Sequence, residues 1–115
     1  MIYPTREDFL IAFGIEPVKV DGDLGLYHYL LRSNEEDADL EISFSSVYRS
    51  FQATIIFQDR TIATISSEMV AKIELNNDIG NSMIRVIFEI NGLIAEAVVK
   101  IEPKITLHWW ILKNF

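Results

Sequence analysis

The chain of 115 residues contains no cysteine. This absence excludes disulfide bonds, thiolate metal sites and a cysteine nucleophile, so an apolar core has to supply the stability. The five glycines and three prolines are scattered, and they form neither a phosphate-binding loop nor a dinucleotide fingerprint. We therefore expect a protein of a reducing compartment, the cytoplasm, that binds no cofactor.

Basic residues are scarce: 10 Lys and Arg stand against 17 Asp and Glu, which gives a formal net charge of −7. Nucleic acid is not an expected partner, because phosphate contacts draw their free energy from Lys and Arg that release counterions. An acidic surface favours a cationic protein partner, and it also serves solubility. Both explanations of the charge stay open at this point.

Long apolar runs are missing too. No stretch approaches the roughly 20 apolar residues of a membrane span, and residues 1–8 lack the pattern of a secretory signal, so we expect no membrane partner. Hydrophobic residues make up 50% of the chain and charged residues 23%, as in an ordinary globular protein. A chain of this length can build one core but not two, which predicts a single domain over residues 1–115.

The first expected element is a helix of about nine residues that follows Thr5. The Thr5 hydroxyl can cap the amide of Asp8, and Gly14 supplies the stop. Spacings of one, three and four residues put several apolar side chains on one side of this helix, which should therefore pack onto a sheet. These side chains are Phe9, Leu10 and Phe13.

The rest of the chain reads almost entirely as strands. Apolar and polar residues alternate through 40–45 and 51–58, and Asn91-Gly92 between 83–90 and 93–101 is a strong hairpin signal. Strands joined by short turns must run antiparallel. We predict an α+β fold in which the N-terminal helix packs on an antiparallel meander of six or seven strands, either as a strongly curved sheet or as a partly closed barrel.

Catalytic residues are hard to find. His28 and His108 are the only candidates for a base near neutral pH, and neither has an acidic residue or a second histidine at metal-ligand spacing. The serines lie in strand or turn contexts without the G-x-S-x-G elbow of a nucleophile. We predict no catalytic residue and no metal site, and hence that the protein is not an enzyme.

Acidic residues concentrate in one segment, which holds five of the seventeen carboxylates within seven positions. Dense like charge repels itself, so this cluster is either a solvated loop or a surface held ready for a cationic partner. Its members are Glu35, Glu36, Asp37, Asp39 and Glu41.

The chain ends in an aromatic segment. Alternation predicts that Trp109 lies in the core and that Trp110 lies on the opposite face of the last strand, expected over residues 105–113. If that face is open, Trp110 belongs to an apolar patch that requires a partner or a second copy of the chain, so a homodimer is one alternative. The other members of the patch would be Ile87, Ile94 and Leu112.

Several segments resemble a family of small bacterial immunity proteins, which are encoded beside contact-dependent or other polymorphic toxins and neutralise them by direct binding. The resemblance is carried by residues 5–10, 13–17, 43–44, 49–52, 62–68 and 103–105 together with Trp109. It implies a small cytoplasmic protein without an active site, whose partner is a basic toxin domain encoded nearby. The acidic cluster would attract that toxin, and aromatic or apolar side chains would slow its release.

Two alternatives do not involve a toxin. A small-molecule carrier would use a pocket on the concave side of a curved sheet, lined by Tyr27, His28, Tyr29 or His108. A structural subunit would join its copies through the face that carries Trp110. A filled core without this pocket argues against the carrier, and a monomeric chain argues against the subunit.

Overall fold

The computed structural model describes residues 1–32, 38–78, 80–102 and 104–112. Within these ranges one helix, α1 (Arg6–Phe13), precedes nine strands that form two antiparallel sheets. The first sheet contains β1 (Lys19–Asp21), β2 (Leu26–Arg32), β3 (Ala38–Ser45), β4 (Ser50–Phe57) and β5 (Arg60–Ser67). The second sheet contains β6 (Val70–Asp78), β7 (Asn81–Ile90), β8 (Leu93–Lys100) and β9 (Thr106–Leu112).

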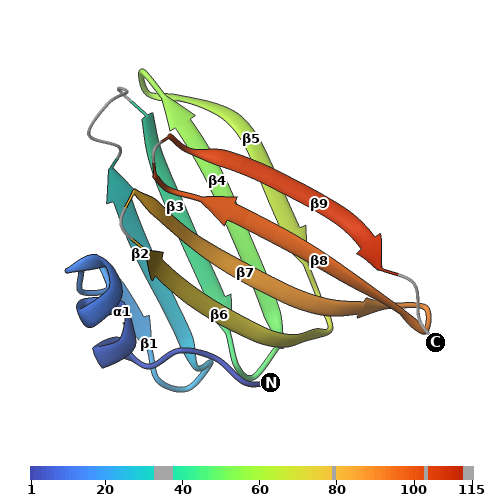
Figure 1. Cartoon of the computed structure of the whole chain (residues 1–115). Coiled ribbons are helices and arrows are strands. Elements are labelled where there is room, and N and C mark those ends of the chain that lie inside the picture. The colour runs from blue at the N-terminus through green and yellow to red at the C-terminus, as the bar shows by residue number, and fades with distance from the viewer. Residues whose placement is uncertain (33–37, 79, 103, 113–115) are drawn as a thin grey trace.

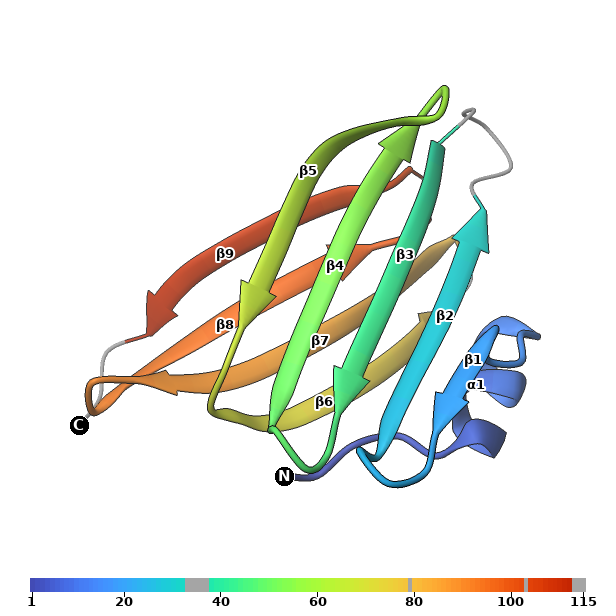
Figure 2. The ribbon, with the colours of Figure 1, turned by 180° about the vertical axis from the view of Figure 1, so that it is seen from behind.

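The two sheets lie as layers with their strands crossing at an angle (Figure 1). Seen from behind, the first sheet forms the front layer and the second sheet lies behind it (Figure 2). In both sheets the strands follow one another in sequence order, so each is a meander. The predicted α+β fold with an N-terminal helix and antiparallel strands is therefore confirmed.

The number and grouping of the strands differ from the expectation. Nine strands take the place of six or seven, and the described strands form two open sheets rather than a closed barrel. The division falls between β5 and β6, where Met69 adopts a left-handed φ of 58° and turns the chain. Long, strongly twisted meanders commonly split in this way, because two stacked sheets bury their apolar faces against each other.

The core lies between the layers and takes one face of each long strand. In β3 the alternation is as predicted: Leu40, Ile42 and Phe44 are buried, whereas Glu41 and Ser43 face outward. The strand pairing places buried residues opposite one another: Ile42 lies opposite Tyr29 of β2 and Ala53 of β4. The second sheet contributes buried residues from its own inward face, among them Ile73, Ile84, Val86, Ala97 and Val99.

Helix α1 begins and ends where the sequence predicts. The Thr5 hydroxyl accepts a hydrogen bond from the Asp8 amide at 3.1 Å, and the Asp8 carboxylate accepts one from the Thr5 amide at 2.8 Å. Gly14 ends the helix with a left-handed φ of 69°, and its amide donates to the Leu10 carbonyl. Two reciprocal bonds at the start and a glycine at the end thus define eight helical residues.

The helix is anchored by one side chain. The fully buried ring of Phe9 stacks on Tyr29 at a centroid distance of 3.9 Å and on Phe44 at 5.9 Å. The predicted stripe is wrong for Leu10, which is 46% exposed, and Phe13 is half-buried. The reason is that α1 lies at one side of the molecule, where it contacts β6 and stacks Phe9 on Tyr29 of β2, and not over a broad sheet face (Figure 1).

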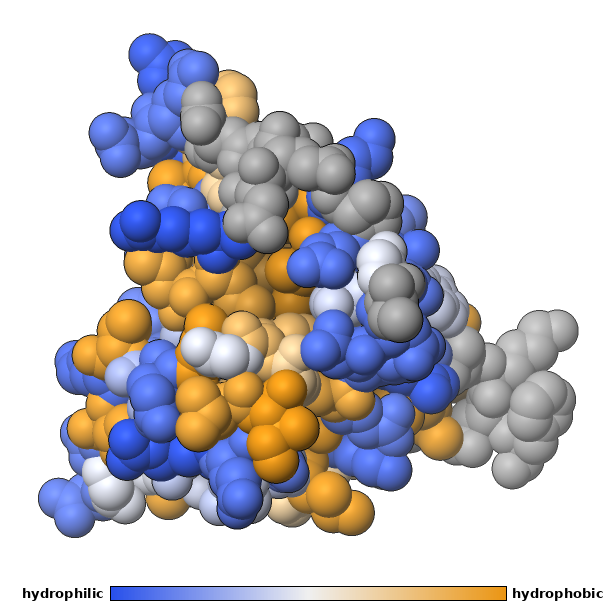
Figure 3. Space-filling model, turned by 60° about the vertical axis from the view of Figure 1, so that its left-hand side comes forward, coloured by the Kyte–Doolittle hydropathy of each residue, from blue (hydrophilic) through white to orange (hydrophobic). Residues whose placement is uncertain are grey.

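Apolar side chains are exposed on the side of the molecule that carries the helix. Figure 3 shows them among hydrophilic residues, and they include Ile2 and Ile11, which are 66% and 75% exposed. The N-terminal segment is tied to β6, because the Ile2 amide donates to the Ala71 carbonyl at 2.9 Å and the Ile2 carbonyl accepts from the Ile73 amide at 2.8 Å. Ile2 therefore bridges to the second sheet through its backbone while its side chain faces solvent.

Replacing Phe9 by alanine should lower the free energy of unfolding by about 3–5 kcal/mol, because it empties a filled site in the core. The matched control is Ile11→Ala in the same helix, which should change stability by less than about 0.5 kcal/mol since this residue is 75% exposed. Urea unfolding followed by circular dichroism measures both. Equal losses in the two variants would contradict this anchoring role.

Burial also perturbs Tyr29. Its side chain is 0% exposed, and its hydroxyl has no hydrogen-bond partner among the described residues. Loss of hydration raises the pKa of Tyr29 to about 12. In the unfolded chain the hydroxyl ionises near its ordinary pKa of about 10. The unfolded state therefore loses its proton first, and the contribution of this residue to stability falls as the pH rises from about 10 to 12.

We expect Tyr29→Phe to remove up to about 2–3 kcal/mol of this alkaline loss. At pH 7 the variant should be as stable as the parent or up to about 1 kcal/mol more stable, because an unpaired buried hydroxyl is deleted. The measurement is the difference between the unfolding free energies of the two proteins from pH 7 to pH 12, which cancels the other tyrosines. Parallel pH profiles would show that Tyr29 is not responsible.

Candidate protein-binding surface

The outward face of the first sheet is rich in hydroxyl and amide groups. Gln52 of β4 lies opposite Ser43 of β3 and Ser66 of β5. Further along the same two strands, Thr54 of β4 lies opposite Thr64 of β5, and the two hydroxyl oxygens are 3.3 Å apart. Because these side chains alternate with the core residues of the same strands, they share one solvent-facing surface.

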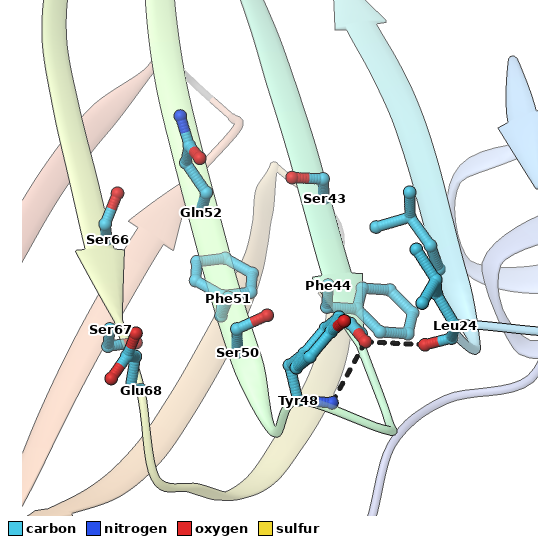
Figure 4. Close-up of a pocket in the computed structure, with 12 residues that line it drawn as sticks. Leu24, Ser43, Phe44, Tyr48, Ser50, Phe51, Gln52, Ser66, Ser67 and Glu68 are labelled. Carbon is cyan, nitrogen blue, oxygen red and sulfur yellow. Dashed lines mark hydrogen bonds between the residues drawn. The ribbon is translucent and has the colours of Figure 1, made fainter. Parts of the chain in front are cut away.

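A cavity of about 600 Å³ opens at the end of this face, beside the turn between β3 and β4. Figure 4 shows Tyr48, Ser50 and Glu68 around it, with Ser43, Gln52 and Ser66 along the strands. None of these residues is predicted from the sequence as a site residue, and the serines are considered there only as nucleophiles and rejected. The sequence signal for the cavity is the serines that alternate with core residues in the strands. These serines do not reveal that the turn before β2 and the turn between β3 and β4 meet at the cavity.

Ser45 holds the turns around this cavity together. Its hydroxyl donates to the Leu24 carbonyl at 2.6 Å and accepts from the Tyr48 amide at 3.1 Å, with 2% of the residue exposed. Beside it, Gly25 adopts a left-handed φ of 56°, and a Cβ atom there would lie 2.0 Å from the Ser46 hydroxyl. The left-handed φ therefore favours glycine at residue 25, and a larger residue there would also force the Ser46 hydroxyl to move.

The same face is acidic at its other end. Asp39 lies 3.9 Å from Arg32, and the Glu41 carboxylate lies 3.9 Å from the His28 ring nitrogen Nε2. These acidic side chains are 40% and 42% exposed, so they remain accessible to a further cation. The other members of the predicted acidic cluster, Glu35, Glu36 and Asp37, lie outside the described residues.

A smaller cavity of about 120 Å³ connects the two ends. It is lined by His28, Glu41 and Thr54, and it shares Ser43 and Gln52 with the larger cavity. We call the two together the outward trough of the first sheet. The trough has both polar and apolar lining residues and a carboxylate at each end, Glu41 and Glu68, which can accept hydrogen bonds from a cationic group.

The outward face of the second sheet carries charges that neutralise one another. Arg85 forms two hydrogen bonds with Glu96, at 2.7 and 3.2 Å, although Glu96 is only 7% exposed. Glu74 lies 3.8 Å from Arg85 and 2.7 Å from Lys72, so positive and negative groups alternate across β6, β7 and β8. The hydrogen bond to Glu96 raises the pKa of Arg85, and the hydrogen bond from Lys72 lowers the pKa of Glu74.

Trp110 lies on this second outward face and is 40% exposed. It pairs with Glu96, which in turn pairs with Ile87, so the expected apolar patch is interrupted by the Arg85–Glu96 ion pair. Ile94 is on the same face, and the side chain of Leu112 is outside the described part of the chain. Because the sheets pack by their inward faces, Trp110 and the pair Asp39 and Glu41 face in opposite directions.

The prediction that Trp109 lies in the core is wrong in one respect. The residue does point inward, opposite Ala97, and its ring stacks on Phe88 at a centroid distance of 6.4 Å. It is nevertheless 56% exposed. The reason is that β9 is the edge strand of the second sheet, so only one neighbouring strand covers the ring.

The residues suggested for a ligand pocket are dispersed. Tyr29 is fully buried and Tyr27 packs beside it on Phe44, whereas His28 lies on the outward trough and His108 is exposed on the second sheet. The structure therefore does not assemble the predicted pocket from these four side chains. Among the described residues no group of three or more His, Asp or Glu side chains could hold a metal ion. No helix in the same ranges is long and apolar enough to cross a membrane.

Comparison with known proteins gives one informative result. No protein-family model matches the chain. No curated protein matches it either. The fold is similar to that of a chain in a solved contact-dependent growth inhibition toxin–immunity protein complex from Klebsiella pneumoniae 342, with a TM-score of 0.84 and 23% sequence identity over 96% of both chains. At this identity the likeness shows a shared fold.

The hydrogen bonds of Ser45 predict a specific effect on stability. Ser45→Ala should lower the free energy of unfolding by about 1–3 kcal/mol, because it leaves the Leu24 carbonyl and the Tyr48 amide without their partner. Ser43→Ala, in the same strand and on the surface of the trough, should change it by less than about 0.5 kcal/mol. Chemical unfolding of both variants measures the difference. A Ser45 variant as stable as the Ser43 variant would refute the role of this hydroxyl.

Proposed function

We propose that this protein is an immunity protein that binds a toxin of a contact-dependent growth inhibition system in the cytoplasm and thereby neutralises it. The observation that carries the proposal is the likeness of nearly the whole chain to a chain from a toxin–immunity complex. The lack of cysteine agrees with a reducing compartment. In this role the protein works by binding alone and uses no cofactor.

The charge of the chain supports a basic toxin domain as the partner. A net charge of −7 attracts a basic protein over distances of about a Debye length, roughly 8–10 Å in ordinary salt. The outward face of β3 adds Asp39 and Glu41, whose side chains are 40% and 42% exposed and lie 3.9 Å from Arg32 and from the His28 ring, respectively. Such surface pairs contribute at most about 1 kcal/mol, so a toxin cation can displace them.

The proposed toxin-binding residues are the members of the acidic cluster: Glu35, Glu36, Asp37, Asp39 and Glu41. Trp110 is proposed for a second, separate contact, because it faces away from Asp39 and Glu41. That contact serves either a toxin segment that reaches round the edge of the sheets or a second copy of this chain. Size-exclusion chromatography with light scattering separates the two, since only the second makes the isolated chain a dimer that Trp110→Ala dissociates.

The acidic contact can be tested with charge-neutral variants of matched size. We expect Glu35→Gln, Glu36→Gln, Asp37→Asn and Asp39→Asn together to slow association with the toxin domain encoded beside the gene at least tenfold and to weaken its salt dependence. The reason is that rim charges act mainly on the association rate. Surface plasmon resonance at two salt concentrations measures both quantities.

The control removes the same four charges elsewhere. Asp59→Asn, Asp78→Asn, Glu89→Gln and Glu102→Gln are all exposed positions outside the cluster. This control should slow association far less, because it changes the net charge equally but leaves the cluster intact. Equal effects of the two sets would reject a localised acidic contact, and failure of the unaltered protein to bind the toxin domain or to protect cells from it would reject the proposed function.

A further inference from the structure

The lining of the larger cavity of the outward trough combines one carboxylate with hydroxyl, amide, aromatic and aliphatic side chains. Of the described residues that line it, Glu68 alone carries a formal charge. The other polar side chains that matter are Ser43, Ser50, Ser66 and Gln52, which offer hydroxyl or amide oxygens as acceptors. A ligand with several N–H donors and a positive charge matches this lining better than an anion does.

The two serines that end β5 point to opposite faces. Ser66 pairs with the exposed Gln52, whereas Ser67 pairs with the core residue Phe51. Because successive side chains of a strand alternate, the Ser66 hydroxyl faces the outward trough and the Ser67 hydroxyl faces inward. Ser66 and the exposed Glu68 are therefore the residues of this segment that a ligand in the cavity can reach.

Tyr48 supplies an aromatic face at the same place. The residue is 65% exposed at the cavity, and the Ser45 hydroxyl fixes its backbone by a 3.1 Å hydrogen bond. A cation over a tyrosine ring is attracted by the negative potential of the ring face. Planar guanidinium groups stack on such rings and donate hydrogen bonds in several directions at once, which a lysine ammonium does not do as well.

We infer that this cavity receives an arginine side chain of the protein partner, whose guanidinium lies against Tyr48 and pairs with the Glu68 carboxylate. This inference rests on the proposed function for the identity of the partner. The site adjoins the acidic end of the trough through Ser43 and Gln52. Long-range attraction by Asp39 and Glu41 and short-range anchoring in the cavity therefore belong to one continuous surface.

The first experiment needs no toxin. The full-length ¹⁵N-labelled chain is titrated with N-acetyl-arginine amide, and its NMR spectra should show shifts concentrated at Tyr48 and at residues 66–68. N-acetyl-citrulline amide has nearly the same shape without the charge and should give at most a tenth of these shifts. Glu68→Gln should abolish the arginine response, whereas Glu102→Gln, an exposed control whose backbone is bonded to Ser82 rather than to the 66–69 segment, should leave it intact.

The second experiment uses the toxin domain encoded beside the gene. Glu68→Gln and Tyr48→Leu should each speed dissociation of the complex at least tenfold, because anchoring side chains act mainly on the dissociation rate. Dissociation rates equal to that of the parent in both variants would overturn the inference while the proposed function stands. An equal response to the arginine and citrulline probes would overturn it as well.

The two ideas can therefore fail separately. If the unaltered chain binds no toxin but responds to the arginine probe through Glu68, the site is supported and the proposed function is rejected. A stronger response to N-acetyl-lysine amide than to the arginine compound would overturn the assignment to a guanidinium. Thermal unfolding of each variant shows whether it is folded, and Glu68 and Tyr48 are both exposed, so we expect melting temperatures within a few degrees of the parent.

Discussion

The stack of Phe9 on Tyr29 and Phe44 is the interaction on which the arrangement of the molecule depends. It joins the helix to the inward face of the first sheet at one side of the molecule, where the helix also contacts β6 (Figure 1). The inward faces of both sheets then pack into one core. The Tyr29 hydroxyl is buried in this core without a hydrogen-bond partner among the described residues. Because side chains alternate along each strand, everything that does not enter this core is presented on two outward faces.

The two outward faces use their charges differently. On the second sheet Lys72, Glu74, Arg85 and Glu96 satisfy one another, and the most buried of the four carries two hydrogen bonds. On the first sheet Asp39 and Glu41 are partly exposed and lie 3.9 Å from Arg32 and His28, and the lining of the cavity beside them includes several hydroxyl groups. A partner that brings positive charge therefore gains more on the first sheet, where less charge is already compensated.

Local signals in the sequence predict much of this fold. The capping box at Thr5, the Asn91-Gly92 hairpin and the alternation through β3 all appear as expected, because each depends on residues close in the chain. The sequence does not predict the split into two sheets, because the residue with a left-handed φ at position 69 is a methionine rather than a glycine. The exposure of Trp109 and the cavity beside Tyr48 depend on which strands are neighbours, and short-range patterns do not contain that information.

The central claim is that the partner binds the outward trough of the first sheet. Hydroxyl-radical footprinting of the protein alone and in complex with the toxin domain encoded beside its gene tests this most directly, because it measures the accessibility of side chains. Tyr48, which is 65% exposed in the free chain, should lose most of its reactivity toward hydroxyl radicals in the complex. Protection confined to side chains of the second sheet, with Tyr48 as reactive as before, would contradict the account.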